Sequence, residues 1–225
     1  MKDIAIYGAG GFGREVACLI RIINKKTPQW NLIGFFDDNA KLKGTKNEYG
    51  EVLGGIEELN NYNQPLAVAI AIGSPKTVAK IVTNIHNTNV EFPNIISPDI
   101  VYLDENNVLI GYGNIIGMRS SISCNVTIGN FNIFNGAISV GHDTSIGNYN
   151  SFMTNTIIAG EVKIGDFNYF GAGSVVLQQI TIGNNTQIGA NSLILYKTKN
   201  GETYIGNPAT IFKYWMINIK SNKYF

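Results

Sequence analysis

The chain has 225 residues, of which 44% are apolar, and its 17 basic and 16 acidic residues give a net charge of +1. This balance argues against a nucleic-acid-binding or polybasic membrane surface, and we find no apolar run long enough for a membrane span. Cys18 and Cys124 lie in different halves of the chain and no signal peptide is evident, so we expect no disulfide framework and a soluble, cytoplasmic protein.

The chain begins with the pattern of a phosphate-binding turn. Residues 4–7 form a short apolar run that predicts a buried strand, and apolar residues at helical spacing predict a helix over residues 14–23. Between them lies the sequence GAGGFG, residues 8–13. Such a turn lets the backbone approach a diphosphate closely and offers the amides of a helix N-terminus to its charge.

Two further strands complete a β-α-β unit. Residues 32–36 predict a strand that ends at Asp37 and Asp38, and residues 66–72 predict another that ends at Gly73. Helices are expected at 56–62 and 77–85, with a surface loop at 41–49. Pro93 and Pro98 disfavour helix at the junction. We therefore expect a Rossmann-like nucleotide-binding domain over residues 1–93.

Two other interpretations of the glycine turn stay open. The turn matches the GxGxxG dinucleotide fingerprint, with Asp37 or Asp38 able to hold a ribose hydroxyl, so NAD binding is one alternative. A domain that ends near residue 93 is, however, too short for the two halves of a full dinucleotide fold. The second alternative is a turn that only packs a helix on a strand.

From residue 110 to residue 194 every sixth residue is large and apolar, without a slip. This period predicts a parallel β-helix with three short strands per eighteen-residue coil. Residues eighteen apart then stack, and residues two before each ladder position should also point inward. In most repeats Gly follows the ladder residue, which we assign to a tight corner with unusual φ and ψ. The ladder residues are Ile110, Ile116, Ile122, Ile128, Phe134, Val140, Ile146, Phe152, Ile158, Ile164, Phe170, Val176, Ile182, Ile188 and Ile194.

The repeat places one of the two histidines at a corner. His142 lies between ladder positions 140 and 146 and is out of register with the inward residues, so we expect it to point outward. Histidine can act as a base near neutral pH, although an ordinary exposed corner residue is the alternative. Gly160 lies one coil further on the same corner. The other histidine, His86, is expected to be a surface residue.

These features together resemble the hexapeptide-repeat acyltransferases, in particular the N-acetyltransferases of nucleotide-linked 4-amino-4,6-dideoxy sugars from bacterial surface-glycan (O-antigen) synthesis. The resemblance also rests on the closing sequence Gly206-Asn207-Pro208-Ala209. It implies a left-handed parallel β-helix over residues 94–225, including a C-terminal tail. Residues 211–219 of this tail are apolar, and we expect them to cover the unpaired edge of the last coil. The resemblance further implies acetyl-CoA as co-substrate, no metal, and a homotrimer with active sites between subunits.

The resemblance also assigns site residues. His142 is the expected catalytic base, and Asp143 orients its ring. Asp143 is shorter than the Glu of many members, and Phe12 and Ser151 stand where many have His. The expected acetyl-CoA contacts are Ser151, Gly160, Ala172 and Ala190. The expected substrate contacts are Gly10, Gly11 and Phe12 for the phosphates, Asp37 and Asp38 for the base or ribose, and Gly73 for the pocket wall.

Two other functions remain open at this point. The same histidine could deprotonate a hydroxyl, as in an O-acetyltransferase acting on a sialic acid, a related sugar or a serine. A non-catalytic scaffold is the other possibility, in which the first domain binds a nucleotide and the β-helix only forms the trimer. The sequence identifies neither the nucleotide nor the sugar.

Overall fold

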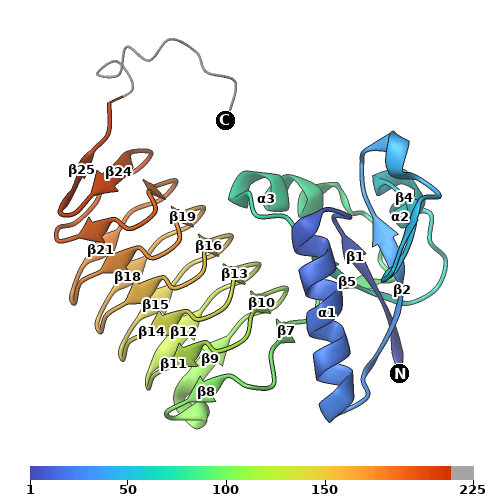
Figure 1. The fold of residues 1–225 in the computed structure, drawn as a ribbon, viewed down its shortest axis with the longest axis horizontal. Coiled ribbons are helices and arrows are strands. Elements are labelled where there is room, and N and C mark those ends of the chain that lie inside the picture. The colour runs from blue at the N-terminus through green and yellow to red at the C-terminus, as the bar shows by residue number, and fades with distance from the viewer. Residues whose placement is uncertain (214–225) are drawn as a thin grey trace.

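The computed structural model describes residues 1–213, which form an α/β domain followed by a three-sided prism of short strands (Figure 1). The sheet of the α/β domain has the order β3-β4-β2-β1-β5-β6, and all its pairs are parallel except β3 with β4. Its strands are β1 (Lys2–Tyr7), β2 (Trp30–Phe36), β3 (Lys46–Asn47), β4 (Gly50–Gly54), β5 (Leu66–Ile70) and β6 (Val90–Glu91). Its helices are α1 (Gly11–Lys26), α2 (Ile56–Asn60) and α3 (Pro75–Asn84), with a 3-10 turn η1 (Ala40–Leu42).

The predicted strands and helices of this domain are confirmed, with ends that shift by a few residues. One face of α1 buries Val16, Ile20 and Ile23, which explains why the apolar spacing revealed the helix. The strands β3 and β4 were not expected. β4 has the sequence GEVLG, and two glycines and a glutamate hide the apolar run that usually indicates a strand.

The prism has three faces, which we name A, B and C. Face A contains β9 (Val108–Ile110), β12 (Val126–Ile128), β15 (Ser145–Ile146), β18 (Lys163–Ile164) and β21 (Thr181–Ile182). Face B contains β7 (Ile95–Ile96), β10 (Ile115–Ile116), β13 (Ile133–Phe134), β16 (Ser151–Phe152), β19 (Tyr169–Phe170), β22 (Gln187–Ile188), β24 (Thr203–Gly206) and β25 (Ala209–Ile211). Face C contains β8 (Val101–Tyr102), β11 (Ser121–Ile122), β14 (Ser139–Val140), β17 (Ile157–Ile158), β20 (Val175–Val176) and β23 (Leu193–Ile194). A 3-10 turn, η2 (Glu105–Asn107), precedes β9.

The eighteen-residue coil is confirmed by the strand pairing. On face B, for example, Phe134 pairs with Ile116 on one side and with Phe152 on the other. Each corner joins two consecutive faces, so we call the corners A–B, B–C and C–A. The first coil is irregular, because Ile96 pairs with Ile116, twenty residues away. A Rossmann-like domain followed by a hexapeptide-repeat β-helix is therefore the observed fold.

The prism interior combines apolar ladders with one polar ladder. Phe134, Phe152 and Phe170 are fully buried, and their rings stack at centroid distances of 4.8 and 4.5 Å. The polar ladder consists of asparagines that point inward at the start of face B. Each donates from Nδ2 to the Oδ1 of the preceding member, and each Oδ1 also accepts from the backbone N–H of the next residue in the ladder. Its members are Asn94, Asn114, Asn132, Asn150 and Asn168, and the N–H of Thr186 ends it.

The expected reason for the corner glycines was wrong. Left-handed φ values occur three residues after the ladder position, for example at Asn125 (φ 54°) and Asp143 (φ 57°), and not at the glycine directly after it. The glycines are required because successive coils pass close to each other. A Cβ on Gly141 would lie 2.5 Å from the backbone nitrogen of Gly160 in the next coil, which no real side chain tolerates.

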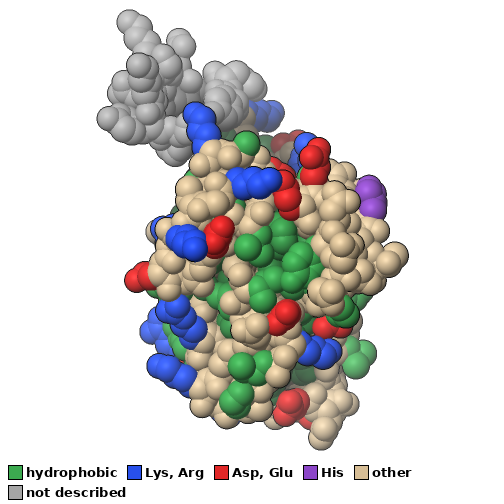
Figure 2. Space-filling view, turned by 90° about the vertical axis from the view of Figure 1, so that its right-hand side faces the viewer, with side chains coloured by type: hydrophobic (Ala, Val, Ile, Leu, Met, Phe, Trp, Pro, Cys, Tyr) green, Lys and Arg blue, Asp and Glu red, His purple; other side chains and the backbone are tan. Residues whose placement is uncertain are grey.

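The α/β domain packs against the beginning of the prism. Phe131 at the A–B corner is buried, and its ring meets that of Phe92 edge-on at 5.2 Å. The same ring stacks on Tyr149, which stacks on Phe167, so an aromatic column continues along this corner. Seen from the side of this domain, hydrophobic side chains form a central patch among charged groups of both signs (Figure 2).

The end of the prism is closed by a hairpin. β24 pairs in parallel with β22, and β25 turns back antiparallel onto β24. The predicted closing sequence Gly206-Asn207-Pro208-Ala209 forms this turn. The expected cover by residues 211–219 falls largely outside the described residues. No helix within residues 1–213 is both long enough and apolar enough to cross a membrane.

Candidate active site

The glycines of the phosphate loop are of two kinds: some are tightly packed against neighbouring backbone, and others border open space. Gly8 has φ 111°, and a Cβ on it would lie 2.7 Å from the carbonyl oxygen of Ala71. A Cβ on Gly13 would overlap the carbonyl oxygen of Gly8, so α1 packs here only without a side chain. Gly10 and Gly73, in contrast, have nothing within 4 Å of an added Cβ. The loop therefore offers an open backbone surface at the N-terminus of α1, as a diphosphate requires.

The two aspartates after β2 accept hydrogen bonds from other residues of the same domain. Asp37 accepts from the backbone N–H groups of Ala9 and Asn39, both at 2.9 Å, and so fixes the phosphate loop. Asp38 accepts from the Tyr7 hydroxyl and from the N–H of Ile56 at the start of α2. Burial and this hydrogen bond raise the pKa of Tyr7. Asp38 is exposed, and only its Oδ1 has partners within residues 1–213, so its Oδ2 remains able to accept a ribose hydroxyl.

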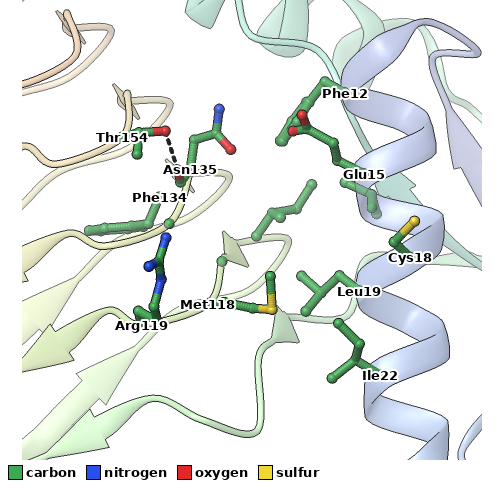
Figure 3. Close-up of a pocket in the computed structure, with 14 residues that line it drawn as sticks. Phe12, Glu15, Cys18, Leu19, Ile22, Met118, Arg119, Phe134, Asn135 and Thr154 are labelled. Atoms are coloured by element: carbon green, nitrogen blue, oxygen red, sulfur yellow. Dashed lines mark hydrogen bonds between the residues drawn. The ribbon is translucent and has the colours of Figure 1, made fainter.

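A largely apolar cavity of about 390 Å³ lies between α1 and the B–C corner (Figure 3). From α1, the side chains of Phe12, Glu15 and Leu19 face the prism. From the prism come Asn135 and Thr154, whose hydroxyl donates to the Asn135 carbonyl at 2.8 Å. Phe12, from the phosphate loop, thus lies against the B–C corner of its own chain.

His142 occupies the C–A corner and points outward, as predicted. Its Nδ1 lies 2.7 Å from Oδ2 of Asp143, and both side chains are about half exposed, at 47% and 50%. The hydrogen bond to His142 is the largest cause that lowers the pKa of Asp143. An ionised Asp143 that accepts from Nδ1–H leaves Nε2 without a proton, which is the form that a general base requires.

Gly160 lies beside His142, and its missing side chain leaves room for the imidazole ring. A Cβ on Gly160 would lie 2.5 Å from Nε2 of His142, so the imidazole occupies the space that a side chain would fill. The expected contact of Gly160 with acetyl-CoA stays a prediction, and the structure gives a second reason for the glycine. Gly160 is required because the ring lies over the next coil.

The corners differ in whether the backbone N–H of the residue two after each ladder position has a hydrogen-bond acceptor. At the A–B corner a side-chain oxygen from the next coil accepts it, as Asn148 does for the N–H of Asn130. At the other corners, the corresponding N–H groups of Gly160, Ala172 and Ala190 have no partner within residues 1–213. Ala172 and Ala190 are also exposed. Unpaired backbone donors in a row are ready to bind a ligand.

Known protein families and solved structures share both domains of this chain. The PglD N-terminal domain model matches residues 3–85, and the bacterial transferase hexapeptide model (six repeats) matches residues 161–196. The chain is thus similar to the hexapeptide-repeat acyltransferases in both of its domains. Among solved structures, it is 25% identical to the acetyltransferase domain of PglB from Neisseria gonorrhoeae FA1090, with 94% of this chain and all of that one covered and a TM-score of 0.84. A second structure of that domain contains acetyl coenzyme A.

Two further structures have the same arrangement of domains. WeeI from Acinetobacter baumannii AYE is 28% identical, with a TM-score of 0.83 over 94% of this chain and all of that one. PerB from Caulobacter crescentus, solved with CoA and GDP-perosamine, is 23% identical, covers 95% of this chain and 98% of that one, and shows the shared fold at a TM-score of 0.83. No curated protein matches the chain in sequence.

In this acyltransferase chain the predicted site residues fall into separate groups. His142, Asp143 and Gly160 come together at the C–A corner. Ala172 and Ala190 lie on the B–C corner, across the width of face C. The predicted nucleotide contacts Gly10, Gly11, Phe12, Asp37, Asp38 and Gly73 surround the carboxyl ends of β1, β2 and β5.

Ser151 joins neither group. It lies on β16 of face B and is only 1% exposed, which leaves no accessible surface for a contact with the thioester. Sequence reasoning also missed Asn125, which donates to the Asp143 carboxylate at 3.0 Å. Its position eighteen residues before Asp143 was available as a signal. Within residues 1–213, no cluster of His, Cys, Asp and Glu has the arrangement of a metal site.

Proposed function

We propose that this protein transfers the acetyl group of acetyl-CoA to the amino group of a nucleotide-linked 4-amino-4,6-dideoxy sugar, in the cytoplasmic stage of bacterial surface-glycan synthesis. The observation that carries the proposal is the pairing of an open phosphate loop with an outward His142–Asp143 dyad. The PglB acetyltransferase domain, solved with acetyl coenzyme A, supports the same reaction class, and PerB, solved with CoA and GDP-perosamine, has the same fold.

The dyad supplies the proton chemistry. The sugar ammonium first loses one proton to solvent and becomes the neutral amine. The amine attacks the thioester carbonyl carbon, and Nε2 of His142 takes a second proton from the nitrogen as the C–N bond forms. The tetrahedral intermediate then collapses, and the C–S bond breaks. The proton held by His142 then passes to the leaving CoA thiolate, which yields the amide and free CoA.

The unpaired N–H groups support a path for the cofactor. We assign the amides of Ala172 and Ala190 to the pantetheine arm, because they are exposed and lie in line eighteen residues apart. Gly160 N–H lies beside the His142 ring and suits the developing oxyanion, where a preorganised donor stabilises the transition state most. Buried Ser151 has no part in this assignment.

We further propose that each active site is shared between two subunits of a trimer. In one chain the phosphate loop lies against the B–C corner, whereas His142 lies at the C–A corner. Face C, between these corners, has an outer surface of small and apolar residues without a charge. Its exposed members include Val101, Leu103, Ile157 and Leu177, and such a surface favours self-association.

The proposal is tested by following CoA thiol release from acetyl-CoA with UDP-, dTDP- and GDP-linked 4-amino-4,6-dideoxy sugars. Serine and a sialic acid serve as hydroxyl acceptors. Turnover with one nucleotide amino sugar is expected, and turnover confined to hydroxyl acceptors would overturn the substrate assignment. His142→Ala should lose about 10²- to 10⁴-fold in kcat while its melting temperature stays unchanged. Activity like that of the wild type would refute the base assignment.

A further inference from the structure

We propose that Asn125 is a positioning residue for the base, acting through Asp143, an inference that rests on the acetyl transfer proposed above. The Asp143 carboxylate is held at both oxygens. Oδ2 meets Nδ1 of His142 at 2.7 Å, and Oδ1 accepts from Nδ2 of Asn125 at 3.0 Å. A carboxylate fixed at both ends has one rotamer, so the imidazole that it orients also has one.

Asparagine is common at left-handed backbone positions, but the hydrogen bond to Asp143 gives the Asn125 side chain a role beyond that preference. Its φ of 54° belongs to the left-handed region, where asparagine is favoured among residues with a side chain. Asn155, Asn185 and Asn191 occupy equivalent positions with φ between 54° and 61°. Among these four, Asn125 alone makes a side-chain hydrogen bond within residues 1–213. The backbone thus explains an asparagine at this place, but not its contact with Asp143.

The charges at this corner explain why the contact matters. Residues three after the ladder position stack in the order Asn125, Asp143, Glu161 and Gln179. Glu161 lies one coil beyond Asp143, and the two carboxylates repel each other. Gln178 and Gln179 donate to Glu161, which lowers its pKa, and Asn125 does the same for Asp143 from the opposite end.

Removal of the Asn125 amide leaves Asp143 held only by His142, and Glu161 repels it from the other side. The carboxylate then turns away from the position in which it fixes the ring. The proton on the imidazole is no longer confined to Nδ1, and a fraction of the rings presents Nε2–H, which cannot act as a base. We therefore expect a loss in kcat rather than in binding of acetyl-CoA.

The primary variant is Asn125→Gly, because glycine keeps φ near 54° without strain and removes only the side chain. We expect kcat to fall about tenfold, with little change in the KM for acetyl-CoA. Asn185→Gly is the matched control: it changes an equivalent position at the A–B corner and should keep full activity. In the Asp143→Ala background, Asn125→Gly should have no further effect, because the residue that it positions is already absent.

Two readouts separate positioning from a structural role. Ring ¹⁵N shifts, assigned with His86→Gln, should show His142 protonated at Nδ1 in the wild type and a mixture of tautomers in Asn125→Gly. Asn125→Asp adds a second negative charge beside the His142–Asp143 pair, which favours proton uptake there, so the loss of kcat in acid should begin at a higher pH.

The outcomes are distinct. Unchanged kcat and ring shifts in Asn125→Gly, with His142→Ala inactive, would overturn the positioning role alone. Full activity in His142→Ala would overturn the proposed function itself. Equal losses in Asn125→Gly and Asn185→Gly, with lowered melting temperatures, would show a backbone effect and also refute the positioning role.

Discussion

Gly160 is the residue against which the ring of the proposed base packs. Its Cα faces the imidazole of His142, and an added methyl group would lie 2.5 Å from Nε2. The ring and the coil beneath it therefore fit only if the residue is glycine. The base is held by Asp143 on one side and by this contact on the other.

Gly160→Ala should consequently displace the ring. We expect kcat to fall about 100-fold, because a base moved by about an ångström loses its alignment with the amine. The KM for acetyl-CoA should change much less, and steady-state kinetics checks both parameters. Gly183→Ala is the control, since its Cβ would meet Asn200 at the A–B corner, away from the base. A raised KM with unchanged kcat would mean that Gly160 contacts the cofactor instead.

Asp143 and the corners illustrate why identical repeats are not equivalent. The left-handed position accepts many residue types, and at the C–A corner it carries Asp143, the proposed partner of the base. The neighbouring A–B corner uses its polar side chains to satisfy its own backbone N–H groups. The difference depends on which side chain the next coil presents.

Among the larger elements, the asparagine ladder fixes the register of the coils. Asn150 is fully buried, and its side chain makes four hydrogen bonds, to Asn132, to the carbonyl of Gly165 and twice to Asn168. A buried side chain with complete hydrogen bonding allows one alignment of successive coils, because any slip leaves polar groups unpaired. An apolar ladder alone would tolerate a slip far better.

Asn150→Ala should therefore lower the free energy of unfolding by about 3 kcal/mol, since it leaves several buried polar groups unpaired and creates a cavity. Urea denaturation followed by circular dichroism measures the change. Exposed Asn63→Ala provides the reference and should alter stability by less than about 0.5 kcal/mol. Equal stability of the two variants would show that the ladder does not stabilise the prism.

The short helix α2 depends on a charge at its first turn. Glu58 pairs with Lys43 and accepts from the N–H of Gly55 at 2.8 Å, and these contacts lower its pKa to about 2. A folded pKa below the ordinary 4.5 means that the stabilisation is complete above that value and disappears as the pH falls toward 2. Glu58→Gln should thus melt below the wild type at neutral pH. The two melting curves should converge in acid, and a constant difference across this range would contradict the assignment.

For the molecule as a whole, the separation of the two site halves predicts complementation. Gly73→Phe should fill the open space beside Gly73, where the nucleotide is proposed to bind, and His142→Ala should remove the proposed base, so each variant alone should be inactive. Subunits mixed in equal amounts and reassembled should recover about a quarter of the wild-type activity, because that share of intersubunit sites joins an intact loop to an intact base. Thiol release measures the recovery. An inactive mixture would mean that each site lies within one chain.

Local sequence patterns predict much of this architecture. The six-residue period predicts the prism, its three ladders and the outward direction of His142, because strand periodicity determines which face a side chain occupies. The glycine turn and the apolar spacing of α1 likewise predict the first domain. These features depend on residues close in sequence or separated by the fixed coil length.

Other features depend on contacts between distant parts of the chain. The packing of strands, domains and coils decides three such features. Asp37 holds the phosphate loop, Ser151 is buried, and the His142 ring lies over Gly160. The corner glycines show the difference most clearly: the period predicts where they occur, but the reason, a backbone passing within contact distance in the next coil, exists only once the coils are stacked. Burial and steric contact between coils are properties of the assembled structure, and the geometry at the C–A corner depends on both.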